Sequence, residues 1–181
     1  MNRELVRTDR LSLTRPSVDD LDRYVELLGD YEVCKMLSRV PYPYDREQGR
    51  VSLLKAQDSW RDVEKATELS FQIGHEGEMI GCFVFKKLQE TPEIGYWLGR
   101  AYWGRGFMSE AVRAAMAWLF ENTDHTRIAC EAMTDNPASI TVAEKVGFRK
   151  AGDVGCESVA RGATVPAVRM EITRDEFFRG L

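Results

Sequence analysis

The segment from residue 93 to residue 121 constrains the fold more than any other part of this sequence. A predicted strand over 93–98 runs into a turn with two glycines, Gly104 and Gly106, and the turn opens a helix predicted over 107–121. Glycine at these points permits a tight backbone bend, which brings several N–H groups and the helix N-terminus close to one place. The pattern predicts an anion site of the kind that cradles a pyrophosphate, or else a tight strand-to-helix turn that needs positive φ.

The rest of the chain supplies the strands and helices of a mixed α and β protein. Three successive strands between residues 69 and 98 predict an antiparallel meander, and a last hairpin is expected to turn at 160–162. The apolar periodicity predicts strands over 9–15, 69–74, 79–87, 93–98, 126–132, 148–157 and 165–173, and helices over 17–28, 45–61, 107–121 and 136–146. Between the first two helices, Val40-Pro41-Tyr42-Pro43-Tyr44 predicts a rigid aromatic loop.

Composition excludes several classes of protein. The chain has 181 residues, 44% of them apolar and 30% charged, which is typical of one globular domain over 1–181 and not of a disordered chain. The 25 Lys and Arg residues against 29 Asp and Glu give a net charge of −4, so no nucleic acid or anionic membrane partner is indicated. A small cationic partner suits this balance better.

Cysteine and histidine usage argues against metal or disulfide chemistry. The four cysteines, Cys34, Cys82, Cys130 and Cys156, are scattered singly, and we expect them to be free, buried thiols. Neither of the two histidines lies at metal-ligand spacing from a cysteine or carboxylate, so no metal site is predicted. The charged N-terminus is unlike a signal peptide and no apolar stretch has the length of a membrane span, so we expect a cytoplasmic protein without a membrane partner.

A second candidate region follows the strand predicted over 126–132. Asn136 and Pro137 are typical of an N-cap and first helical position, and Gly147 is typical of a helix C-terminus. Helix capping does not explain Ser139, whose hydroxyl we expect in the first helical turn, on the side of any ligand beside the preceding strand.

Together the two regions resemble a known family. Four runs closely resemble the GNAT acetyltransferases, specifically their RimJ/RimL-like branch: Glu93-Ile94-Gly95-Tyr96-Trp97-Leu98-Gly99, Tyr102-Trp103-Gly104-Arg105-Gly106-Phe107-Met108-Ser109-Glu110-Ala111, Asn136-Pro137-Ala138-Ser139 and Glu144-Lys145-Val146-Gly147-Phe148-Arg149-Lys150-Ala151-Gly152. The resemblance extends to the segments 10–16, 40–44 and 169–174, so it covers most of the chain.

The resemblance implies a fold and a cosubstrate. The family has an α+β, three-layer architecture, here a mixed and mostly antiparallel seven-stranded sheet with about four helices, splayed between the fourth strand (93–98) and the fifth (127–132). Acetyl-CoA enters that opening. The residues expected to bind it are Trp97, Leu98 and Gly99 at the pantetheine and thioester, Trp103, Gly104, Arg105, Gly106, Phe107 and Met108 at the pyrophosphate, and Asn136 and Ser139 near the sulfur.

The catalytic residues follow from the resemblance with two departures. Ala101 replaces a common Gln or Arg, and Ala143 stands where many members carry a tyrosine that donates to the leaving thiolate, which leaves Ser139 as the best replacement. Glu93 is the candidate base, acting directly or through a water, although a simply solvated carboxylate at a strand edge accounts for it equally well. Glu131 on the neighbouring strand is the reserve.

The resemblance implies an acetyl-CoA-dependent N-acetyltransferase that acts on a primary amine by direct attack in a ternary complex. The acceptor is either a protein N-terminal α-amine, as for RimJ and RimL, or a small amine such as a polyamine, amino acid or antibiotic. A non-catalytic CoA-binding regulatory module is the alternative outside enzymes. The family also has many dimers, so a homodimer is compatible with the resemblance.

Overall fold

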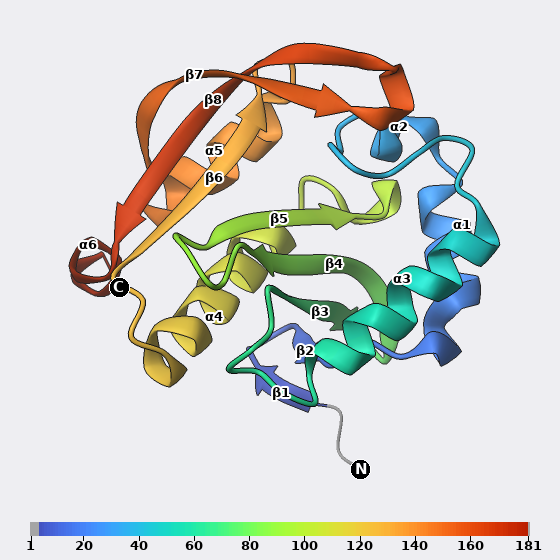
Figure 1. Ribbon diagram of the computed structural model, residues 1–181, viewed down its shortest axis with the longest axis horizontal. Coiled ribbons are helices and arrows are strands. Elements are labelled where there is room, and N and C mark those ends of the chain that lie inside the picture. Colours follow the sequence, from blue (N-terminus) through green and yellow to red (C-terminus); the bar gives the residue numbers. More distant parts are fainter. Residues whose placement is uncertain (1–3, 181) are drawn as a thin grey trace.

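The backbone forms one mixed sheet with helices on both faces (Figure 1). The computed structural model describes residues 4–180. In these residues the strand order is β1-β2-β3-β4-β5-β6-β8-β7. The strands are β1 (Glu4–Arg7), β2 (Ser12–Thr14), β3 (Glu68–His75), β4 (Glu78–Lys86), β5 (Glu93–Leu98), β6 (Arg127–Met133), β7 (Arg149–Ser158) and β8 (Ala163–Thr173). The α-helices are α1 (Leu21–Leu28), α2 (Tyr31–Cys34), α3 (Arg46–Ser59), α4 (Phe107–Asn122), α5 (Pro137–Val146) and α6 (Arg174–Arg179), joined by short 3-10 turns at Val18–Asp20, Arg100–Tyr102 and Val159–Arg161.

The sheet opens between β5 and β6. These two strands are parallel and pair only at Glu93 with Ala129 and at Ile94 with Cys130, whereas β5 pairs with β4 along its full length. Beyond Ile94 the strands diverge, as Figure 1 shows, because β6 follows β8 away from the meander. The splay expected between the strands at 93–98 and 127–132 is thereby confirmed.

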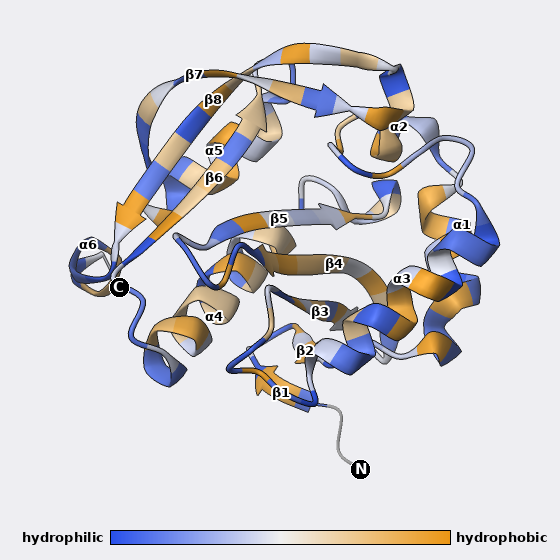
Figure 2. Cartoon of the chain, viewed as in Figure 1, coloured by the Kyte–Doolittle hydropathy of each residue, from blue (hydrophilic) through white to orange (hydrophobic). Residues whose placement is uncertain are grey.

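The two faces of the sheet differ in chemistry. The face toward α4 is apolar, since Phe83, Phe85 and Ile94 pack there in the main core with the buried side of that helix. On the opposite face, Cys82 and Trp97 pack against α1, but the strand ends near the closed part of the splay carry charged residues. Figure 2 shows the resulting alternation of hydrophilic and hydrophobic residues along β6 and β8.

The sheet has eight strands and not the expected seven. The additional strand is β1, which holds only two apolar residues between charges and gains its conformation by pairing with β2. The first predicted strand, 9–15, is shorter than expected, since β2 spans only Ser12–Thr14.

The described residues also hold six α-helices instead of about four. The two that were missed, α2 and α6, have four and six residues, which is too short for a periodic apolar pattern. The other boundaries agree with the prediction to within a few residues, and the meander and the last hairpin are confirmed. Cys34, Cys82, Cys130 and Cys156 are free and buried, as expected. Among residues 4–180, no helix has the length and apolar character needed to span a membrane.

Candidate active site

A cavity of about 510 Å³ occupies the open part of the sheet. On one side it is bounded by β5 and by the turn that leads into α4, and on the other by β6 and the start of α5. Residues of α2 and of the segment after it also line the cavity, at what we call its far end. The lining includes Val33, Met36–Ser38, Lys86, Ile94–Leu98, Tyr102–Gly104, Gly106–Ser109, Cys130–Met133, Asp135–Ser139, Thr141, Val142, Lys145 and Cys156.

One wall of the cavity has backbone groups without a strand partner. Because the pairing of β5 with β6 ends at Ile94, the edge of β5 from Gly95 to Trp97 faces the opening unpaired within the described sheet. The carbonyl of Leu98 is occupied, since it accepts a hydrogen bond of 2.8 Å from the indole nitrogen of Trp103. An edge of this kind can bind an extended ligand with amide groups.

The turn before α4 has the expected left-handed glycines. Gly104 has φ +71° and Gly106 has φ +78°, and Gly106 is the N-cap of the 16-residue helix α4. No side chain caps this helix end, so its first N–H groups have no side-chain acceptor, and the residues at this end, Gly106, Phe107 and Met108, line the cavity. The helix dipole adds to these donors, and the end of α4 therefore suits an anionic group.

Arg10 from the N-terminal segment holds this turn in place. Its guanidinium donates to the carbonyl of Arg105 at 3.0 Å and forms an ion pair of 2.6 Å with Glu110 of α4. It also stacks over the ring of Phe107, 4.7 Å from the ring centroid. Arg10 therefore connects the turn, at Arg105, with the first residues of α4, although it lies about a hundred residues earlier in the sequence.

The start of α5 places Ser139 beside an aromatic hydroxyl from β5. Asn136 caps the helix, since its side chain accepts from the N–H of Ser139 at 3.2 Å, as the capping pattern predicted. The Oγ of Ser139 lies 3.1 Å from the Oη of Tyr96, which also donates to the Ser139 carbonyl at 3.2 Å. Burial raises the pKa of Tyr96 far above its ordinary value, so the phenol keeps its proton at neutral pH. Ala143, further along α5, is fully buried and has no donor.

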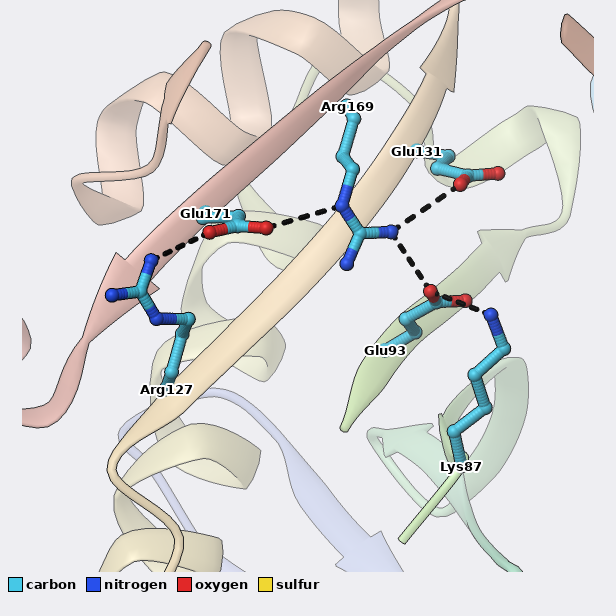
Figure 3. A network of polar contacts seen from close by, with 6 residues as sticks. All are labelled: Lys87, Glu93, Arg127, Glu131, Arg169 and Glu171. Atoms are coloured by element: carbon cyan, nitrogen blue, oxygen red, sulfur yellow. Dashed lines mark hydrogen bonds and ion pairs between the residues drawn. The ribbon is translucent and has the colours of Figure 1, made fainter. Parts of the chain in front are cut away.

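A charged network closes the narrow end of the splay (Figure 3). The carboxylate of Glu93 accepts hydrogen bonds from Lys87 at 2.8 Å and from Arg169 at 2.9 Å, and the same Arg169 nitrogen lies 3.5 Å from Glu131. Arg169 continues to Glu171 at 3.1 Å, which in turn accepts from Arg127 at 2.6 Å. The network therefore links β5, β6 and β8.

The two candidate bases sit differently in this network. Glu93 is buried, with 6% of its surface exposed, and it does not line the cavity. Burial raises its pKa, but the hydrogen bonds from Lys87 and Arg169 outweigh this effect and the pKa is lowered from its ordinary value. Glu131 does line the cavity and keeps a third of its side chain exposed.

Most of the predicted binding residues surround the cavity. Gly99 and Arg105 do not line it, whereas the other nine do: Trp97, Leu98, Trp103, Gly104, Gly106, Phe107, Met108, Asn136 and Ser139. The sequence reasoning missed Tyr96, Lys86 and the segment Met36–Ser38. For Tyr96 and Lys86 a signal existed in the strand alternation, but it becomes informative only once the sheet is known to open at this point.

The far end of the cavity is held by contacts between the segment after α2 and the tip of the β7–β8 hairpin. Arg161 donates to the carbonyl of Lys35 at 2.7 Å and pairs with Asp135 at 2.5 Å. The N–H of Val159 donates to the carbonyl of Ser38 at 3.1 Å. These contacts join the segment after α2 to the last hairpin beside the cavity.

Comparison with known proteins identifies similar chains. Residues 10–149 match the acetyltransferase (GNAT) domain family. A Bacillus licheniformis protein named as an uncharacterised N-acetyltransferase, p20, is 28% identical over 96% of this chain and 98% of its own length. The RimL ribosomal L7/L12 α-N-protein acetyltransferase in complex with coenzyme A has the same fold, with a TM-score of 0.83 at 20% identity over 96% of this chain and 99% of that one. A Vibrio cholerae spermidine N-acetyltransferase in complex with CoA and spermine gives a TM-score of 0.77 at 17% identity, over 94% and 99% of the two chains.

Proposed function

Because the chain belongs to the GNAT family of N-acetyltransferases, we propose that it transfers the acetyl group of acetyl-CoA to a primary amine by direct attack in a ternary complex. One observation carries the proposal. The unpaired edge of β5 and the uncapped N-terminus of α4 border the same cavity, which gives one ligand both amide partners and an anion site.

The residues around the cavity fit acetyl-CoA in their donor chemistry. The N–H groups that follow Gly104 and Gly106 suit its pyrophosphate, and the free backbone of Gly95–Trp97 suits the amides of its pantetheine arm. When bound, acetyl-CoA supplies a thioester carbonyl as the electrophile and a thiol as the leaving group. The chain's own residues then have to orient this group, exclude water and manage two protons.

Ser139 is proposed as the hydrogen-bond donor to the sulfur. Ala143 has no donor, while the hydroxyl of Ser139 lies in the lining at the start of α5. Tyr96 supports this role, since its single proton is directed to the Ser139 carbonyl or hydroxyl, and in the first case the Ser139 proton is free to point into the cavity. An alcohol has a much higher pKa than a thiol, so Ser139 acts by hydrogen bonding and not by full proton transfer.

Glu131 is proposed as the group that accepts the proton lost by the attacking nitrogen, directly or through a water. Glu131 faces the cavity, whereas the carboxylate of Glu93 forms ion pairs with Lys87 and Arg169. In this arrangement Glu93 acts through Arg169 as a positioning residue for Glu131. An α-amine, with a pKa near 8, is neutral in roughly 10% of molecules at pH 7, so a weak base is sufficient for it.

The acceptor class is supported only as a primary amine. RimL acts on a ribosomal protein and the Vibrio cholerae enzyme acts on spermidine, and both share this fold. A panel of N-terminal peptides, polyamines and amino acids, with thiol release from acetyl-CoA as the readout, tests the proposal. We expect amine-dependent thiol release, and a lower kcat with little change in KM for acetyl-CoA in Ser139→Ala. Binding of acetyl-CoA without turnover of any amine would instead support a non-catalytic CoA-binding module.

A further inference from the structure

Lys86 is a lysine of the cavity without a partner. It is the last residue of β4, it lines the cavity, and its ammonium has no hydrogen bond or ion pair with any residue from 4 to 180. The neighbouring cations differ in this respect: Lys87 pairs with Glu93, Arg169 pairs with both Glu93 and Glu131, and Arg161 pairs with Asp135.

The side chain of Lys86 lies beside a glycine of the neighbouring strand. The side chain lies across the β5 backbone at Gly95, where a Cβ would come within 3.7 Å of its Cε and 3.9 Å of its Nζ. Gly95 is the first residue of β5 beyond the pairing with β6, so the ammonium sits where the sheet begins to open. Burial lowers the pKa of Lys86, and its ammonium has no ion pair with any of the residues from 4 to 180.

The side chain of Lys86 lies on the face of the sheet opposite to α4, whose N-terminus is the expected pyrophosphate site. Residues at alternate positions share a face, and Lys86 shares its face with Gly95 and Trp97, opposite to α4. Glu131 extends from the other side of the opening on this same face. An acceptor that enters from this face therefore meets a cation on the β4 side and a carboxylate on the β6 side.

We propose that Lys86 binds a carboxylate of the acceptor, which makes the acceptor a small α-amino acid whose amine faces Glu131. The inference rests on the proposed acetyl transfer and names its substrate class. It disfavours a polyamine, because a second cation beside Lys86 would be repelled. The lining by Met36, Leu37 and Met133 favours an apolar side chain on that amino acid.

Pairs of acceptors that differ only in the carboxylate measure the contribution of that group to turnover. L-alanine, L-methionine and L-phenylalanine are each compared with their primary α-amides, and spermidine is added as a polycation. The ammonium group of each amide is more acidic than that of the corresponding acid, so a larger fraction of the amide has a neutral, reactive amine at pH 8. Any preference for the acid therefore has to come from the protein. We expect kcat/KM for the best acid to exceed that for its amide by about tenfold or more, as one charge-assisted contact allows.

Variants then assign the preference to Lys86. Lys86→Met should abolish it through a higher KM for the acid, with KM for acetyl-CoA unchanged, and Lys86→Arg should retain most of it. Lys55→Met, on the exposed side of α3, removes the same charge away from the cavity and should behave as wild type.

Two results would overturn the inference while the proposed function stands: equal turnover of acids and amides by the wild type, or an equal loss for both in Lys86→Met. A raised KM for acetyl-CoA in Lys86→Met would place the lysine at the donor and also overturn it. If no acceptor is turned over, the acids and their amides are titrated calorimetrically into the complex of the protein with CoA. There, acids that bind no better than their amides would refute the carboxylate site, and the absence of turnover would count separately against acetyl transfer.

Discussion

Replacing Arg169 with methionine should destabilise the protein in a pH-dependent way. Arg169 donates to the buried carboxylate of Glu93 at 2.9 Å and to Glu171 at 3.1 Å. In Arg169→Met, Glu93 keeps only Lys87, whose side chain is half exposed, while Glu171 keeps Arg127. The variant thus leaves the buried Glu93 carboxylate partly uncompensated, and it disturbs the less buried carboxylates of Glu171 and Glu131 much less.

The magnitude follows from the burial of Glu93. Hydrogen bonds to charged groups contribute about 1.5–3 kcal/mol each, and those to exposed pairs contribute less than about 1 kcal/mol. With 8% of the Glu93 side chain exposed, we expect a loss of about 2–3 kcal/mol in the free energy of unfolding at pH 7. In a protein of this length that loss lowers Tm by roughly 5–10 °C.

The sign of the pH dependence follows from the direction of the pKa shift. The pKa of folded Glu93 lies below its ordinary 4.5, so its contacts stabilise the folded state above pH 4.5, and this contribution is lost as the pH falls through the lowered pKa. The difference between wild type and Arg169→Met should therefore be full at pH 7 and smaller at pH 3. Urea unfolding at both pH values measures it.

Arg127→Met is the matched control. Its guanidinium is half exposed and pairs only with Glu171 in the described network, so we expect a loss below about 1 kcal/mol. An equal cost for the two variants at pH 7, or a cost of Arg169→Met that persists unchanged at pH 3, would refute the reasoning that the buried Glu93 carboxylate governs the network.

Three further predictions concern the donor site. Gly106→Ala, at φ +78°, should raise KM for acetyl-CoA several-fold and lower the free energy of unfolding by about 1–2 kcal/mol. The control, Gly162→Ala at φ +61° in the last hairpin, should lower the free energy of unfolding by a similar amount and leave KM unchanged. Steady-state kinetics and thermal unfolding measure both variants. Arg10→Met should raise KM for acetyl-CoA about threefold to tenfold with a smaller change in kcat, and an unchanged KM would exclude its role in holding the turn. Tyr96→Phe should lower kcat several-fold and combine non-additively with Ser139→Ala; additive effects would separate the two hydroxyls.

Local signals made much of this fold predictable. The glycines at 104 and 106, the Asn136 cap and the strand alternation depend on neighbouring residues, and the structure has the turn, the helix and the meander that they indicated. The short elements β1 and α2 were not predictable in the same way, because their conformation depends on pairing and packing with distant segments and not on their own few residues.

In the candidate site, too, the features set by neighbouring residues were predictable and those set by distant segments were not. The backbone donors around Gly104 and Gly106 could be placed from sequence because they belong to one turn. The surroundings of Glu93 could not, since its burial depends on Lys87 and on Arg169, which lies 76 residues away. A solvated strand-edge carboxylate and a buried, paired one look the same in sequence, and they are distinguished only by contacts of the folded chain, here with Lys87 and with Arg169 of β8.

A crystal structure with CoA bound tests the central claim most directly. We predict that the pantetheine lies between β5 and β6 along Gly95–Trp97, with the pyrophosphate at the N-terminus of α4 and the sulfur beside the hydroxyl of Ser139. CoA bound outside this opening, or with its sulfur on the far side of the cavity from Ser139, would contradict the account.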